Sequence, residues 1–158
     1  MQPRVTFLLK ALIAVMLLLL LISQIIVIPE VARITAIRNP DVAQLELPGI
    51  VGAVVFLLLV EVTLVCVWRL LSLVRTERIF SPDAFRYVDV ILAALITAGV
   101  LITTSYVVIV ANRAVSLQLT LLAVLGTVVS AALALLVVVL RGLLRKALEL
   151  EQDLAEVV

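Results

Sequence analysis

The sequence predicts an all-α fold, namely an integral membrane bundle of four helices with both termini in the cytoplasm and a helical extension at the C-terminus. Three observations favour this fold class. Hydrophobic residues make up 65% of the 158 residues and charged residues only 15%, against about 25% charge in a typical soluble domain. Four long segments are almost free of charge, and most basic residues lie on one side of them. A soluble fold of this length could not bury so much apolar surface.

Each of the four segments is long enough to cross the membrane, because a hydrocarbon core about 30 Å thick needs roughly 20 apolar residues. The first ends at Pro29, and its length favours a retained helix over a cleaved signal peptide. The second begins at Pro48, in a first helical turn that tolerates proline, and carries one charge, Glu61. The predicted spans are residues 7–28, 48–68, 90–111 and 117–140, in a single membrane domain over residues 1–158.

Positively charged residues indicate the orientation of the helices, because the cytoplasmic flanks of membrane helices accumulate lysine and arginine. Nine of the 12 basic residues lie on the side that both termini share, and three lie on the other side. We therefore expect both termini in the cytoplasm. The nine are Arg4, Lys10, Arg69, Arg75, Arg78, Arg86, Arg141, Arg145 and Lys146, and the three are Arg33, Arg38 and Arg113.

The outer connection at residues 29–47 has two interpretations. Val31, Ile34 and Ile37 recur at helical spacing, which predicts a short helix lying on the outer membrane surface. The alternative is a partly ordered loop that packs over the bundle.

The cytoplasmic connection before the third span contains the signals of a helix start. Ser81 is the expected N-cap, Pro82 the first helical residue, and Asp83 an acid in the first turn. Phe80 and Phe85 occupy the two positions of a hydrophobic staple. The third helix should therefore begin about two turns before the membrane.

Residues 141–158 should continue the fourth span as one amphipathic cytoplasmic helix, because no glycine or proline follows Leu143. Its apolar residues alternate at spacings of four and three, the pattern of a coiled-coil seam. Such a short helix is marginal alone in water, so we expect it to bind a cytoplasmic protein or a second copy of the chain. The alternatives are that it folds back on the corner around Phe80 or frays. The C-terminal seam consists of Leu143, Ala147, Leu150, Leu154 and Val157.

Glu61 is the candidate for intramembrane chemistry, at roughly 12 Å along the helix from the Trp68–Arg69 boundary. No lysine or arginine lies at this depth in another span, and an unpaired carboxylate there is costly. We predict that Glu61 is protonated at neutral pH and bonded to hydroxyl groups of the later helices. Glu61 could serve as a proton or cation site, or its hydrogen bond could simply hold two helices together. The candidate hydroxyl partners are Thr97, Thr103, Thr127 and Ser130.

Small residues predict where helices approach closely. Gly126, Ser130 and Ala134 form a small-residue ridge on the fourth span, and Ala94 and Ala98 form a shorter one on the third. In lipid, small side chains let two helices come together and gain van der Waals contact. The pattern leaves open whether the ridge packs within one chain or between two copies.

Composition argues against several classes of function. The chain has no histidine, and its one cysteine, Cys66, lies in an apolar run, so histidine metal sites, histidine bases and an intrachain disulfide are excluded. The net charge of +1 argues against direct binding of nucleic acid, which needs a gathered basic excess. We expect no enzyme activity and no cofactor or metal. We expect membrane lipid to surround the chain.

Two stretches carry a resemblance to a known family. Residues 78–89 (RIFSPDAFRYVD) and 140–150 (LRGLLRKALEL), together with the four spans, resemble the YoaS-like family of uncharacterised four-helix bacterial membrane proteins (domain of unknown function 2975). The resemblance implies a multi-pass protein of the bacterial inner membrane, whose gene often lies beside one for a small helix-turn-helix regulator. It implies no catalytic residues.

Two functional hypotheses follow. The first is a regulatory or adaptor protein whose C-terminal helix binds a cytoplasmic partner, such as a small helix-turn-helix regulator. The second is a small transporter or channel subunit that uses Glu61. The first requires the C-terminal seam, whereas the second requires Glu61 and not the seam.

Overall fold

The computed structural model describes residues 3–75 and 82–156, and almost all of these residues are helical. Four helices in this part of the chain are long and apolar enough to cross a membrane, which confirms the all-α, four-helix membrane bundle that the sequence predicts. The elements are α1 (Pro3–Ile22), the π-helical turn η1 (Ser23–Val27), α2 (Ile28–Arg38), the 3₁₀ helix η2 (Pro40–Leu45), α3 (Glu46–Arg75), α4 (Pro82–Ala111) and α5 (Leu117–Glu156).

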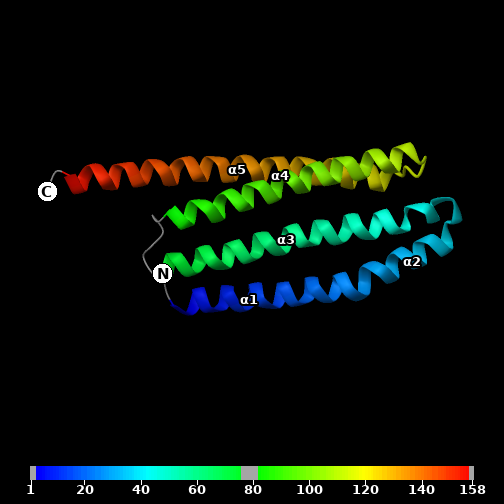
Figure 1. The fold of residues 1–158 in the computed structure, drawn as a ribbon, viewed down its shortest axis with the longest axis horizontal. Coiled ribbons are helices and arrows are strands. Elements are labelled where there is room, and N and C mark those ends of the chain that lie inside the picture. Colours follow the sequence, from blue (N-terminus) through cyan, green and yellow to red (C-terminus); the bar gives the residue numbers. More distant parts are fainter. Residues whose placement is uncertain (1–2, 76–81, 157–158) are drawn as a thin grey trace.

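The helices form an open bundle in which neighbours in the chain are neighbours in space (Figure 1). The α1–α2 rod packs against α3, α3 against α4, and α4 against α5, with consecutive rods antiparallel. Among the described residues, α5 has no extensive contact with α1. We call the end where α1 begins, α3 ends, α4 begins and α5 ends the terminal end of the bundle.

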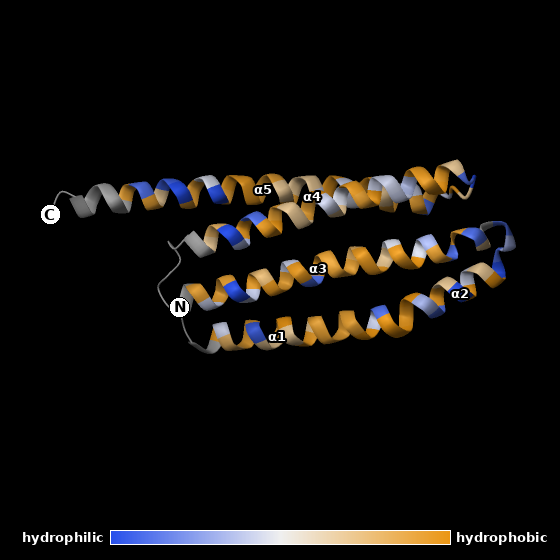
Figure 2. Ribbon diagram, viewed as in Figure 1, coloured by the Kyte–Doolittle hydropathy of each residue, from blue (hydrophilic) through white to orange (hydrophobic). Residues whose placement is uncertain are grey.

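Hydrophobic residues predominate along the long helices (Figure 2), and many of their side chains are exposed on the outside of the bundle. Phe7, Leu8 and Leu117 are 74%, 74% and 76% exposed, whereas the buried residues include the small Ala94 and Ala98. In water such a surface would be an aggregation hazard, but lipid tails are as apolar as leucine and can cover it. The chain therefore has the make-up of a multi-pass membrane protein.

We predicted from the sequence that the first helix ends at Pro29. In the structure it continues through η1 and α2 as far as Arg38. Proline lacks an N–H group, and its ring would clash with the carbonyl one turn earlier in a regular helix. The wider turn η1 comes directly before it, where the N–H of Ile28 donates to the carbonyl of Ser23. Pro29 then lies in the first turn of α2, where an N–H is not needed. The expected surface helix is thus an extension of the first rod that packs against α3.

The predicted corner before the third span lies partly outside the described residues, since these exclude Phe80 and Ser81. The helix α4 begins at Pro82, as the proline at the first helical position predicts. Ala84 is only 1% exposed and Phe85 is half-buried. The start of α4 is therefore packed against the rest of the bundle.

The turn between α4 and α5 closes both helices with local hydrogen bonds. Arg113 adopts a left-handed conformation with φ of 56°, and its N–H and that of Ala114 donate to the carbonyls of Val110 and Ile109. This is the Schellman pattern that satisfies the last carbonyls of a helix. Ser116 then caps α5, because its Oγ accepts from the N–H of Leu119 at 3.2 Å.

The last helix is the longest element, with 40 residues against 30 in each of α3 and α4. At about 1.5 Å per residue it spans roughly 60 Å, and it extends past the other helices at the terminal end (Figure 1). The predicted continuation of the fourth span is confirmed as far as Glu156. The described part of the tail does not fold back on the α4 corner, contrary to one alternative from the sequence.

Candidate functional site

Glu61 lies near the middle of α3 and faces the α1–α2 rod at η1. Its Oε1 atom accepts a hydrogen bond from Nε2 of Gln24 at 2.9 Å, and both side chains are half-buried. None of the ion pairs among the described side chains includes Glu61. Its partner in this part of the chain is therefore a neutral amide, and the polar pair joins η1 of the first rod to α3.

Gln24 projects from the irregular turn η1 (Ser23–Val27). A π-helical turn inside an α-helix is rare and recurs at functional sites. Pro29, one turn later, cannot donate to a carbonyl of this turn. The Gln24–Glu61 pair thus lies at the least regular point of the first helix.

The hydroxyl groups that we expected around Glu61 bond elsewhere, so that part of the prediction is wrong. They lie on α4 and α5, whereas Glu61 faces the α1–α2 rod, and hydroxyl side chains in helices readily bond the carbonyl four residues earlier. Thr97 donates to the carbonyl of Ala93 at 2.8 Å, Thr103 to Gly99 at 2.9 Å, Thr127 to Ala123 at 2.8 Å, and Ser130 to Leu95 at 2.6 Å. Thr103 and Thr127 also lie 3.5 Å apart.

The small-residue ridge of α5 packs against α4 within the chain. Ser130 is 8% exposed, and its bond to the Leu95 carbonyl crosses between the two helices. A Cβ atom on Gly99 would lie 3.1 Å from Oγ of Ser130, and one on Gly126 would lie 3.2 Å from Cδ1 of Ile102. The absence of side chains at these glycines allows the close approach of α4 and α5.

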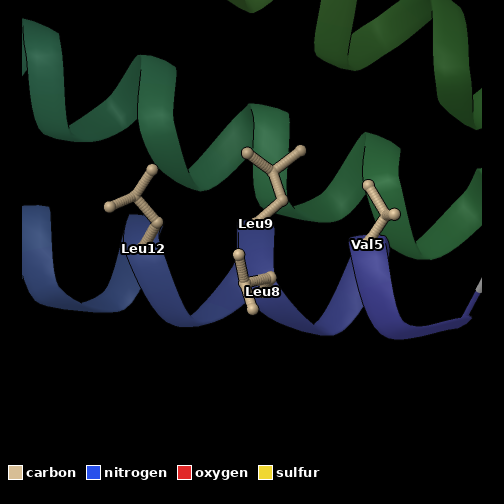
Figure 3. Close-up of a pocket in the computed structure, with 4 residues that line it drawn as sticks. All are labelled: Val5, Leu8, Leu9 and Leu12. Atoms are coloured by element: carbon tan, nitrogen blue, oxygen red, sulfur yellow. The ribbon is translucent and has the colours of Figure 1, made fainter.

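Two apolar hollows lie on the outside of the bundle, and neither has an ionisable residue in its lining. Both are open at the surface, so they offer contact area for lipid chains. One lies beside α1 and is lined by Val5, Leu8, Leu9 and Leu12 (Figure 3). The other follows α4 and α5, and its lining includes Leu95, Gly99, Thr103, Thr127, Ser130 and Ala134.

The C-terminal seam is open along its described part. Leu143 and Leu150 are 61% and 58% exposed, and Ala147 is exposed between them. The side chain of Leu154 and the whole of Val157 lie outside the described residues. An ion pair between Arg145 and Glu149 at 3.4 Å lies on the opposite face of the helix and supports it locally.

A second ion pair holds the base of this tail. Nε of Arg141 lies 3.0 Å from Oδ1 of Asp89, and its Nη2 atom donates to Oδ2 at 3.1 Å. This two-bond geometry ties α5 to the first turns of α4. Beyond Arg141, the described seam residues Leu143, Ala147 and Leu150 are exposed.

Residues 30–158 match the family model for a protein of unknown function, DUF2975. The chain belongs to this family. The match begins in α2, so Glu61 and the C-terminal seam lie inside the family region while Gln24 lies before it. No curated protein and no solved structure matches the chain.

The contacts of this DUF2975 chain that the sequence analysis missed include the Arg141–Asp89 pair and a bond from Lys10 to Ser72. Both contacts join side chains of neighbouring antiparallel helices at the terminal end of the bundle. Comparing residues at equal depth on adjacent helices would have found them, and would also have matched Gln24 to Glu61.

Proposed function

We propose that this chain is a membrane-anchored adaptor whose C-terminal helix binds a soluble cytoplasmic protein. The observation that carries this proposal is the exposure of Leu143 and Leu150, at 61% and 58%, on a helix that extends past its neighbours. Burying one leucine side chain is worth about 1.5–3 kcal/mol. A partner that covers both would gain at most about 3–6 kcal/mol from these two side chains, as part of a larger interface.

The charge pattern supports a cytoplasmic tail. The terminal end carries Arg86, Arg141, Arg145 and Lys146 near the ends of α4 and the apolar part of α5, as the positive-inside rule expects. The partner's complementary surface would be an apolar groove or a second amphipathic helix. The family resemblance favours a small helix-turn-helix regulator, which the chain would hold at the bacterial inner membrane without contacting nucleic acid itself.

Affinity capture from native membranes tests the adaptor role. We expect the full chain to retain a soluble protein that is lost after truncation beyond Lys146 and in Leu150→Lys. Glu149→Lys is the matched control, because it adds the same side chain on the opposite face of the same helix. With the purified partner, Leu150→Lys should weaken binding roughly 30-fold, the equivalent of about 2 kcal/mol.

A different result would show that the seam mediates self-association. In that case two differently tagged copies of the chain co-purify, Leu150→Lys abolishes this, and no soluble protein is captured. That result contradicts the adaptor role. Equal capture by Leu150→Lys and Glu149→Lys would contradict a function of the seam altogether.

A second candidate function, a small transporter or channel subunit, is favoured by the Gln24–Glu61 pair in the irregular turn of the first helix. Intramembrane acids mark proton and ion pathways in many transporters. In proteoliposomes under a pH gradient, this role predicts proton uptake that Glu61→Gln abolishes and truncation after Lys146 leaves unchanged. No proton flux in the parent chain would contradict it.

A further inference from the structure

Lys10 is held in a fixed position between α1 and α3 at the terminal end of the bundle. Its Nζ atom donates to Oγ of Ser72 at 2.8 Å and lies 5.8 Å from the centroid of the Trp68 ring, within the range of a cation–π contact. The side chain is half-buried. The ammonium group is therefore positioned by α3 and does not move freely in solvent.

No carboxylate among the described side chains pairs with Lys10. Arg69, the residue after Trp68, is exposed and also belongs to none of these ion pairs. Arg69 and Ser72 are three residues apart on a helix and so lie on adjoining positions of its surface. Arg69 is thus a second cation one helical turn from Ser72, and neither it nor Lys10 forms an ion pair among the described side chains.

The depth of these groups indicates which anion can reach them. Ser72 lies within the last turn of α3, which ends at Arg75, and tryptophan is enriched at the level of lipid head groups. At this depth a bilayer offers the phosphate of its own lipids. Lysine binds phosphate as a point charge and arginine as a fork of donors, and basic pockets between membrane helices bind anionic head groups.

We propose that Lys10 and Arg69 bind the phosphate of an anionic phospholipid at the junction of α1 and α3, with its head group against Trp68. This site uses neither the C-terminal seam nor Glu61, so it is independent of the proposed function. Such a site would enrich anionic phospholipid beside α1 and α3.

Trp68 provides the readout, since it is the single tryptophan of the chain. The full-length protein would be reconstituted in vesicles that contain either phosphatidylglycerol or phosphatidylcholine with the same brominated acyl chains, which quench tryptophan on contact. We expect the anionic lipid to quench Trp68 at a lower mole fraction, with a relative binding constant above that of the zwitterionic lipid. Lys10→Gln and Arg69→Gln should each reduce this preference about fivefold.

Two variants serve as controls. Lys146→Gln removes an exposed cation at the terminal end on α5, away from Trp68, and should leave the preference unchanged. Lys10→Arg keeps the charge and should retain most of it, and circular dichroism verifies that every variant is helical. Equal quenching by the two lipids in the parent chain would overturn the proposal. So would a preference that survives in both Lys10→Gln and Arg69→Gln.

Discussion

Gly99→Leu should destabilise the α4–α5 pair by about 2–3 kcal/mol, the upper range for overpacking a close contact. Even the first added carbon would lie 3.1 Å from Oγ of Ser130. That oxygen cannot easily retreat, because it is bonded at 2.6 Å to the carbonyl of Leu95. The two helices would have to separate, with loss of this hydrogen bond and of the surrounding van der Waals contact.

Unfolding in mixed micelles with increasing dodecyl sulfate, followed by circular dichroism, measures this effect. Gly142→Leu is the matched control, because no atom lies within 4 Å of a Cβ atom at Gly142. It should be neutral or slightly stabilising, since leucine favours a helix by up to about 1 kcal/mol over glycine. Equal stability of the two leucine variants would show that α4 and α5 do not pack at Gly99.

Gln24→Leu should leave the Glu61 carboxyl group without its hydrogen-bond donor in an apolar environment. The expected loss of stability is about 1–3 kcal/mol, the cost of an unsatisfied buried polar group. Glu61→Gln should cost less, because an amide can still accept the bond from Gln24. The double variant Gln24→Leu, Glu61→Leu should recover part of the loss, because both polar groups are then removed.

Infrared spectroscopy reports on the same pair. If Glu61 is protonated at neutral pH, as the sequence predicts, the parent chain has a carboxylic acid band that Glu61→Gln removes. In Gln24→Leu this band should move to higher frequency because its carbonyl loses a donor. Glu30→Gln, in the exposed part of α2, should leave the band intact. A band that survives Glu61→Gln unchanged would contradict the protonated state.

The number and limits of the membrane helices could be predicted because their causes are local. Long uncharged runs, Pro82 at a helix start and the absence of helix breakers after Leu143 each determine one feature, and α4 and α5 follow these signals. The predicted end of the first helix at Pro29 was wrong, because it relied on the local signal of the proline alone. Whether proline ends a helix depends on the turn before it, and η1 absorbs the disruption without ending the rod.

The partners of polar side chains could not be predicted from local pattern alone. Glu61 is the only charge in its predicted span, but its partner depends on which helix it faces. The open order of the bundle places α1 against α3, so Gln24 is the neighbour and the threonines of α4 and α5 are not. The small-residue ridge gave the correct helix face because it needs only one close neighbour, and α4 supplies it.

The continuity of α5 from Leu117 to Glu156 has a mechanical consequence. An α-helix with unbroken hydrogen bonds resists twisting, so a rotation of its membrane part about the long axis turns Leu143 and Leu150 through nearly the same angle. A tilt in the bilayer likewise swings the free end through an arc that grows with its distance from the pivot. For any tilt of α5, residues near Glu156 are therefore displaced farther than Leu143.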